Sequence, residues 1–227
     1  MTASRAADGR LDARPSAAPA GPPPAPGTSA LDLDLGTEVL LAVPPGEVGA
    51  LLVFCHGAGG SAADALRAVG DLATARGVAV LAPTSAGTTW DLIAGGLGRD
   101  VAVLDAALAD VFTRLPVAHV ALAGFSDGAS YALSLGVANG DLAEAVLAFS
   151  PGFVAVPGRY GRPRFWISHG TDDRVLPVER CGRRVAAALR ADGYDVSYDE
   201  FAGGHVVGPD LVTAALGWWL DGDRGPG

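Results

Sequence analysis

The sequence predicts an α/β protein whose central, mostly parallel sheet is covered by helices on both faces. Short apolar runs alternate along the chain with segments in which apolar residues recur at helical spacing, and the connections between them are mostly short. Such runs are typical of parallel strands that are buried on both faces of a sheet. The expected strands cover residues 50–55, 78–82, 117–123, 145–149, 164–168 and 194–201.

The segments between these strands carry apolar residues every three to four positions, which is the spacing of one helix face. Ser61 precedes the first of them in the position of a helix cap. Before the first strand, Leu31, Leu33 and Leu35 alternate with aspartates and apolar residues 39–43 follow, which predicts a hairpin or a pair of edge strands. The expected helices carry the stripes Leu66, Val69, Leu72 and Ala73; Val101, Leu104, Leu108, Val111 and Leu115; Val178, Cys181, Val185 and Leu189; and Val212, Ala215, Leu216 and Trp219.

Length and composition predict one folded domain and a disordered leader. The chain has 227 residues and is 49% hydrophobic, which suits a single compact domain over residues 31–227. Because the connections are short, we expect no inserted cap domain. Residues 13–27 are dominated by Pro, Ala, Gly and Ser and bury too little apolar surface to offset the loss of chain entropy. Residues 1–30 are therefore expected to be disordered.

Charge and composition exclude several classes of partner. Lys plus Arg number 16 against 25 Asp plus Glu, and the net charge of -9 repels nucleic acid phosphates and anionic lipid headgroups. Cys55 and Cys181 have neither the spacing of zinc ligands nor that of a disulfide framework, so we expect both to pack in the core. No apolar run resembles a signal peptide or a membrane span. We therefore expect a cytoplasmic protein without stable membrane insertion, metal or organic cofactor.

A candidate nucleophile lies in the motif Gly124-Phe125-Ser126-Asp127-Gly128. The pattern Gly-x-Ser-x-Gly is typical of a sharp strand-to-helix turn that holds a serine in a strained backbone conformation. Alone it is a weak signal, because an ordinary glycine-rich turn with a capping serine fits it too. Here the apolar residues 117–123 precede the motif and helical spacing over residues 129–137 follows it, which is the context that the chemistry requires.

A serine nucleophile needs a base to accept its proton and a third group to orient that base. Downstream of Ser126 the chain has two histidines, and only His205 follows a plausible acid on a late loop. That acid is expected shortly after the strand at residues 164–168, where Asp172 and Asp173 are adjacent. Spacing alone leaves both aspartates open.

An oxyanion hole requires two backbone N–H groups directed at the developing negative charge. The first is expected to be the amide of Asp127, at the start of a helix whose dipole favours negative charge. The second is assigned to Ala58, in the glycine-rich segment that follows the strand at residues 50–55. Longer loops over residues 85–97 and 151–163 suggest the substrate pocket, with Trp90 and Phe153 as its expected walls.

These motifs together resemble those of the phospholipase/carboxylesterase group of α/β-hydrolases, which includes acyl-protein thioesterases, from about residue 51 to residue 220. The resemblance implies the α/β-hydrolase fold without a cap domain. It also favours Asp173 over Asp172 as the acid and implies the remaining roles as assigned above. Family members commonly have Gln after the nucleophile, where this chain has Asp127. The motifs are His56-Gly57-x-Gly59-Gly60, Gly124-Phe125-Ser126, His169-Gly170-x-x-Asp173-x-x-x-Pro177 and Gly204-His205.

The expected function is hydrolysis of a small carboxylic ester through an acyl-enzyme, with Ser126 as nucleophile, His205 as base and Asp173 as acid. The expected partner is a small-molecule ester, and the oligomeric state is left open between monomer and homodimer. A thioesterase or a peptidase would use the same residues. A binding protein without catalytic activity, built on a hydrolase scaffold, is an alternative from a different class.

Overall fold

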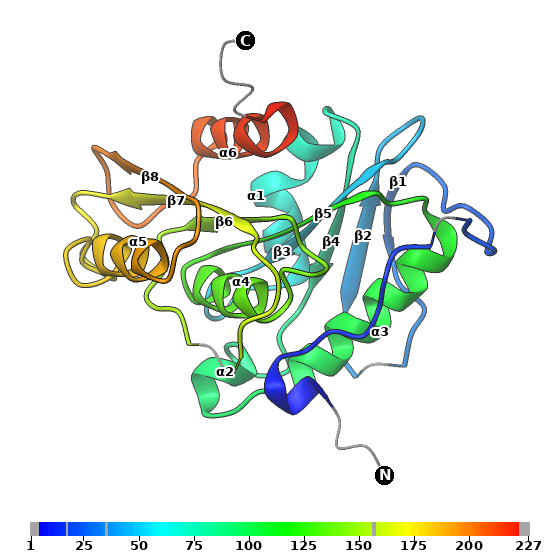
Figure 1. The fold of residues 1–227 in the computed structure, drawn as a ribbon. Coiled ribbons are helices and arrows are strands. Elements are labelled where there is room, and N and C mark those ends of the chain that lie inside the picture. Colours follow the sequence, from blue (N-terminus) through cyan, green and yellow to red (C-terminus); the bar gives the residue numbers. More distant parts are fainter. Residues whose placement is uncertain (1–4, 17, 35, 156–157, 223–227) are drawn as a thin grey trace.

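The computed structural model describes residues 5–16, 18–34, 36–155 and 158–222. They form an eight-stranded, mostly parallel sheet with helices on both faces, as the sequence predicts (Figure 1). The strand order is β1-β2-β4-β3-β5-β6-β7-β8, antiparallel at β1/β2 and β2/β4 and parallel elsewhere. The strands are β1 (Gly27–Ala30), β2 (Val39–Val43), β3 (Ala50–Cys55), β4 (Val78–Pro83), β5 (His119–Phe125), β6 (Ala145–Phe149), β7 (Arg164–Gly170) and β8 (Val196–Phe201).

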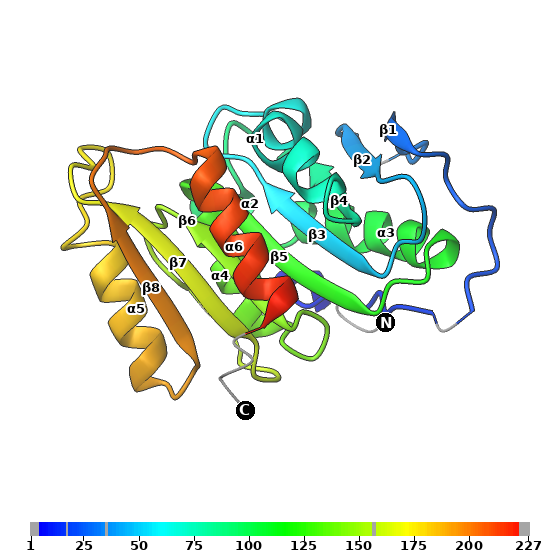
Figure 2. The same ribbon diagram turned by 90° about the horizontal axis from the view of Figure 1, so that it is seen from above.

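The helices form one layer on each side of the sheet (Figure 2). On one face lie α1 (Ala62–Thr74) and α6 (Pro209–Asp221). On the other lie α3 (Arg99–Arg114), α4 (Asp127–Ala138) and α5 (Gly182–Ala191). The short α2 (Asp91–Ala94) contacts α4, and the 3-10 helix η1 (Arg5–Asp8) lies against α3.

Each face of the sheet has its own hydrophobic core, and β3 shows why. Successive side chains of a strand point to opposite faces. Leu51 and Val53 belong to the core under α3 and α4, whereas Leu52 and Phe54 belong to the core under α1 and α6. All of these side chains are buried, which explains why the strand is apolar at every position.

The expected edge hairpin is present, but its first strand lies earlier in the chain than predicted. β2 matches the predicted residues 39–43, and its partner β1 is at Gly27–Ala30 instead of residues 31–35. Every β1 residue is exposed, so burial leaves no periodic signal in its sequence. Leu31 and Leu33 lie after the end of β1 and pack against a core, and the Leu31 amide still donates to the Val39 carbonyl of β2 over 2.9 Å. Leu35 lies outside the described residues.

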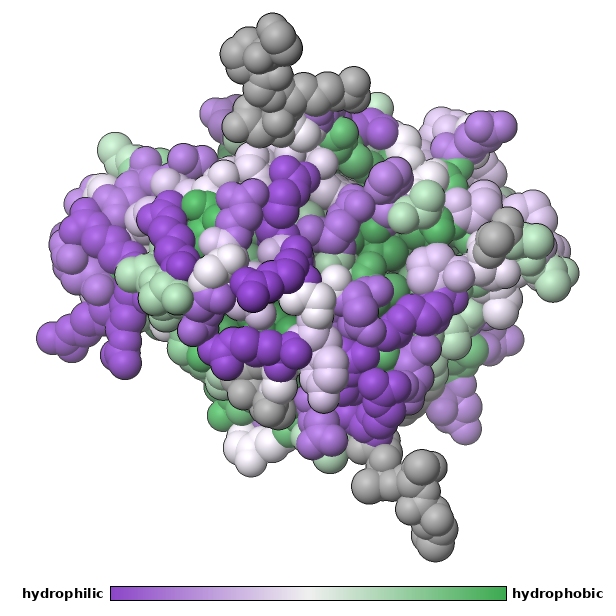
Figure 3. Space-filling model, in the orientation of Figure 1, coloured by the Kyte–Doolittle hydropathy of each residue, from purple (hydrophilic) through white to green (hydrophobic). Residues whose placement is uncertain are grey.

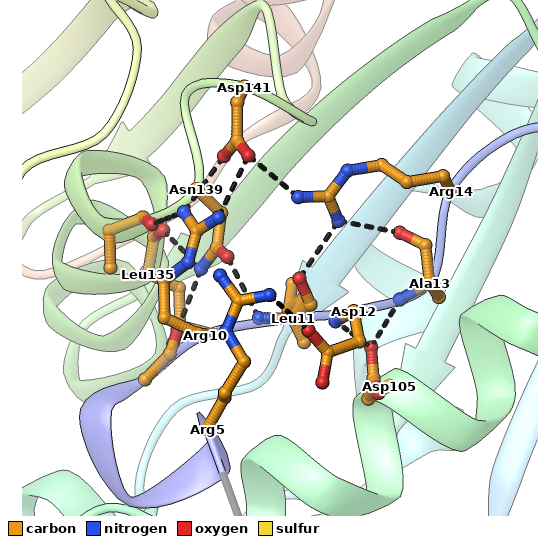
Figure 4. A network of polar contacts seen from close by, with 12 residues as sticks. Arg5, Arg10, Leu11, Asp12, Ala13, Arg14, Asp105, Leu135, Asn139 and Asp141 are labelled. Carbon is orange, nitrogen blue, oxygen red and sulfur yellow. Dashed lines mark hydrogen bonds and ion pairs between the residues drawn. The ribbon is translucent and has the colours of Figure 1, made fainter.

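The N-terminal segment differs from the disordered leader that its composition predicts. Apart from residues 1–4 and 17, which lie outside the described residues, the leader has a definite path along α3 and the end of α4 (Figure 4). Leu11 is fully buried in the core of that face, and Arg10 is buried beside it. Two anchoring side chains thus hold a segment whose average composition is that of a linker.

Polar contacts to the end of α4 complete this anchor (Figure 4). Both terminal nitrogens of the Arg10 guanidinium donate to the carboxylate of Asp141, each over 2.8 Å. Arg10 and Arg14 hold the pKa of the Asp141 carboxyl well below its ordinary value, chiefly through the Arg10 hydrogen bonds. The Asn139 side chain accepts from the Leu11 amide over 2.8 Å and donates to the Gly9 carbonyl over 2.7 Å. These bonds satisfy backbone groups that would otherwise be buried without partners.

The surface of the face in Figure 3 is mostly hydrophilic, and hydrophobic residues reach it in several separate areas. Among the described residues, no helix combines the length and the apolar character needed to cross a bilayer.

Replacing Arg10 tests the N-terminal anchor. We expect Arg10→Ala to lower the free energy of unfolding by about 2 kcal/mol, because it removes a buried cation and leaves the Ala138 carbonyl and the Asp141 carboxylate without it. Urea unfolding followed by tryptophan fluorescence measures the change. The control is Arg5→Ala, which breaks the exposed Arg5–Asp12 pair and should cost less than about 0.5 kcal/mol. Equal losses in the two variants would contradict the anchor.

Candidate active site

The elbow between β5 and α4 places Ser126 at the carboxyl end of the sheet. Ser126 has φ 57° and ψ -119°, a conformation that L-residues rarely adopt. Strain of this kind costs on the order of 1–3 kcal/mol and persists where neighbouring structure enforces it. The Ser126 amide donates to the Phe149 carbonyl at the end of β6 over 2.9 Å, which fixes the turn against the neighbouring strand.

The two glycines of the elbow are required by close backbone contacts. A Cβ on Gly128 would lie 2.1 Å from the Cys55 carbonyl oxygen at the end of β3. A Cβ on Gly124 would lie 2.3 Å from the Gly128 carbonyl oxygen. Both positions are therefore closed to any other residue unless the backbone moves.

Three side chains from distant parts of the chain lie in one hydrogen-bonded line at this edge. The Ser126 hydroxyl lies 2.8 Å from Nε2 of His205, to which it can donate. The other ring nitrogen of His205, Nδ1, lies 2.7 Å from Oδ2 of Asp173 and donates to it. An imidazole with its proton on Nδ1 leaves Nε2 free to accept the proton of the serine.

The carboxylate of Asp173 is buried and receives several donors. Its Oδ1 accepts from the amides of Val175 and Leu176 over 2.9 and 2.8 Å. Burial raises the pKa of this carboxyl, but the hydrogen bonds from Leu176 and His205 outweigh burial, so the pKa lies below its ordinary value. Asp173 is therefore held ionised. The adjacent Asp172 is exposed.

His169 is a second histidine at Asp173, and the sequence analysis assigned it no role. Its ring is fully buried, and Nε2 lies 2.7 Å from the Leu176 carbonyl and 3.3 Å from Oδ2 of Asp173. The ring thus braces the turn that carries Asp173. The sequence feature that could have indicated this role is the position of His169, directly before Gly170 and four residues before Asp173.

The expected oxyanion donors come from the start of α4 and from the loop after β3. The Asp127 amide is in the first turn of α4, where helix N–H groups have no partner within the helix. The Asp127 carboxylate accepts from the Thr89 hydroxyl over 2.7 Å. In the facing loop, Nδ1 of His56 donates to the Gly57 carbonyl over 2.7 Å, and Nε2 accepts from the Ser85 amide over 3.0 Å. Burial lowers the pKa of His56, so this neutral ring braces the loop that contains Ala58.

Of the two residues expected as pocket walls, Trp90 is buried and Phe153 borders a cavity. Trp90 is only 1% exposed, its ring stacks on Tyr131 at 4.7 Å between centroids, and Nε1 donates to the His56 carbonyl over 2.9 Å. Trp90 is therefore packed in the core and hydrogen-bonds to the loop that contains His56. Phe153 is partly exposed and borders a different cavity, of about 280 Å³, together with Arg180 and Arg184.

Two serines on α4 were missed by the sequence analysis. The Ser130 hydroxyl accepts from the Gly152 amide over 2.9 Å, and the Ser134 hydroxyl accepts from the Ala155 amide over 3.0 Å. They fasten the loop after β6 to the helix that begins at the elbow. Their spacing of four and eight residues from Ser126 placed them on one helix stripe.

A cavity of about 220 Å³ is lined by the loop after β3, by helix α1 and by Phe125 of the elbow. Among the described residues, no three His, Cys, Asp or Glu side chains form a group that could hold a metal ion.

Comparisons with known proteins identify the fold. No family model and no curated protein matches the chain. Esterase PE8 matches with a TM-score of 0.66 at 24% identity, over 86% of this chain and 100% of that one. Protein TT1662 from Thermus thermophilus has a TM-score of 0.61 at 25% identity over 86% and 98%, and the Bacillus cereus carboxylesterase has 0.62 at 16% over 82% and 94%.

The fold is the α/β-hydrolase fold. The sequence prediction of fold class is confirmed, and the described residues contain no inserted cap domain.

Replacing Gly128 tests the close contact at the elbow. We expect Gly128→Ala to destabilise the protein by at least about 3 kcal/mol, because its Cβ meets carbonyl oxygens of Cys55 and His56 instead of flexible side chains. The control is Gly96→Ala, where a Cβ would have no atom within 4 Å, and its stability should stay within about 1 kcal/mol of wild type. Thermal unfolding of both variants decides. A stable Gly128→Ala protein would refute this packing.

Proposed function

We propose that this protein is a serine hydrolase that cleaves small carboxylic esters through an acyl-enzyme. The observation that carries the proposal is the hydrogen-bonded line from Ser126 through His205 to Asp173. Similar folds occur in proteins named as esterases and carboxylesterases, which agrees with it. The motifs described above also support kinship with the phospholipase/carboxylesterase group.

In the first half of the reaction, Oγ of Ser126 attacks the ester carbonyl carbon while Nε2 of His205 takes the hydroxyl proton. The tetrahedral intermediate then collapses, the bond to the alcohol oxygen breaks, and His205 returns its proton to the leaving alcohol. In the second half, His205 takes a proton from water as the water attacks the acyl carbon. The second tetrahedral intermediate then collapses, the bond between the acyl carbon and Oγ of Ser126 breaks, His205 returns its proton to Oγ, and a carboxylic acid leaves.

The surroundings supply the electrostatic part of the mechanism. The Asp173 carboxylate, held ionised, stabilises the imidazolium that forms on His205 and keeps the Nδ1 proton in place. The amides of Asp127 and Ala58 are proposed to donate to the oxyanion of the intermediate. This role uses only the backbone amide of Asp127, so the side chain at this position need not be Gln. The Asp127 carboxylate itself accepts a hydrogen bond from Thr89.

Replacing Ser126 tests the proposed nucleophile. We expect Ser126→Ala to reduce hydrolysis of p-nitrophenyl acetate by about 10⁴-fold or more and to abolish labelling by a fluorophosphonate probe, because it removes the hydroxyl that is hydrogen-bonded to Nε2 of His205. Mass spectrometry of the labelled wild type should place the probe on Ser126. A wild-type protein that neither turns over esters nor reacts with the probe would favour a binding scaffold. Rates on matched ester, thioester and amide substrates separate an esterase from a thioesterase or a peptidase.

A pair of neighbouring variants tests the acid. We expect Asp173→Asn to lower kcat by about 10³–10⁴-fold, because an amide at this position favours the wrong tautomer of His205. Asp172→Asn is the matched control, since its side chain is exposed, and it should keep kcat within about twofold. Circular dichroism checks that both variants are folded. If Asp172→Asn lowers kcat more than Asp173→Asn does, Asp172 is the acid and the proposed assignment is wrong.

A further inference from the structure

The 220 Å³ cavity beside the elbow is a pocket lined mainly by apolar side chains. Its walls come from the end of β3, the loop after it, helix α1, the elbow and the segment after His205. Ala65 and Ala68 of α1 form one side of the pocket. Because their side chains are small, a larger residue at either position would take up space in the pocket. The lining includes Phe54, Gly57, Ala65, Ala68, Phe125 and Val207.

Gly57, which lines the pocket, lies next to the elbow that carries the proposed nucleophile. A Cβ at Gly57 would lie 3.5 Å from Cβ of Ser126 and 3.2 Å from the ring of Phe125. This wall of the pocket is therefore in contact distance of the elbow. Ala58, whose amide is proposed as an oxyanion donor, lines the pocket as well. A group bound there would lie beside a carbonyl that is being attacked by Ser126.

The opposite wall of the pocket adjoins the base. The ring of Phe125 lies against the imidazole of His205, with 4.7 Å between centroids. Val207 follows His205 by two residues and faces the same pocket. One side chain of the pocket lining, Phe125, thus borders the imidazole, and Val207 belongs to the same loop as His205.

We propose that this pocket binds the alcohol portion of the substrate, and that the alcohol is short, apolar and uncharged. The inference rests on the proposed function. In that reaction the leaving oxygen receives its proton from His205, so the alcohol must lie beside the imidazole, where Phe125 and Val207 form walls. The acyl group extends from the other side of the carbonyl carbon.

Charge and size narrow the class of alcohol. The rim carries Asp64, whose carboxylate is held by the Ser61 hydroxyl over 2.7 Å and by Arg67. Among the described residues no Lys or Arg lines this pocket, and burial lowers the pKa of His56, which does line it, so that this ring is neutral. An alcohol with a carboxylate or phosphate would find no counter-charge there. The volume of 220 Å³ is below the roughly 300–1,000 Å³ of pockets that hold drug-sized ligands. A chain of a few carbon atoms fits, and a lipid backbone does not.

Filling the pocket from α1 tests the proposal. Ala68 is half-buried and lines the pocket, so Ala68→Leu should insert three carbon atoms into it. We expect kcat/KM for butyl acetate, relative to methyl acetate, to fall by at least about tenfold, because a pocket rejects each excess methylene by a factor of this order. Across methyl acetate, methyl butanoate and methyl hexanoate, the relative kcat/KM values of the variant should be those of wild type. Ala63→Leu is the matched control, as it makes the same change on an exposed position of the same helix.

The outcomes separate this proposal from the proposed function. If Ala68→Leu instead changes selectivity along the acyl series, or changes neither series, the assignment of the pocket to the alcohol is wrong. Deacylation adds a second readout, since the alcohol has left by then. A change in the deacylation rate of a longer acyl-enzyme would also reject the assignment. Failure of the proposed function looks different, because wild type would then hydrolyse none of these esters and would resist the fluorophosphonate probe.

Discussion

The start of α4 passes so close to the end of β3 that backbone meets backbone at Gly128, where no side chain fits beside the Cys55 carbonyl. This contact fixes the turn between β5 and α4, and the turn forces Ser126 into its positive φ. It also brings the loop that contains Ala58 close to the elbow. The strained serine, the two proposed oxyanion donors and the mouth of the apolar pocket therefore depend on one steric constraint.

The remaining part of the site is built by hydrogen bonds around Asp173 instead of by close packing. Its carboxylate receives two backbone amides of its own turn, and the buried His169 ring ties that turn to the Leu176 carbonyl. His205 lies on a loop between β8 and α6 and has the Asp173 bond as a fixed point. A rigid serine and a rigid acid thus hold between them a histidine that is partly open to solvent. Such an arrangement would suit the proposed base, because the orientation of the imidazole is set before a substrate binds.

The sequence predicted the fold class and the residues that meet at the sheet edge, because both leave local patterns. Apolar runs identify buried strands, and the Gly-x-Ser-x-Gly turn combines a motif with its strand–helix context. Spacing could not distinguish Asp172 from Asp173 as the acid, because the side chains of adjacent residues differ only in the direction in which the turn points them. Trp90 was assigned to a pocket wall and is buried, because a large aromatic residue in a glycine-rich loop suits either role. The anchor at Arg10 and Leu11 was missed because composition averages over a segment, whereas its partners lie 128 residues away.

That separation affects how the chain folds during synthesis. Residues 10 and 11 leave the ribosome long before residues 138 and 139, and at typical elongation rates the interval is on the order of ten seconds. Throughout that time an arginine and a leucine that end up buried remain without their binding site. The segment can dock only after the helix that begins at the elbow has formed, so it closes over a domain that is already half assembled. The segment therefore attaches late in folding. The first half of the domain is complete only after the middle of the chain has been synthesised and has folded.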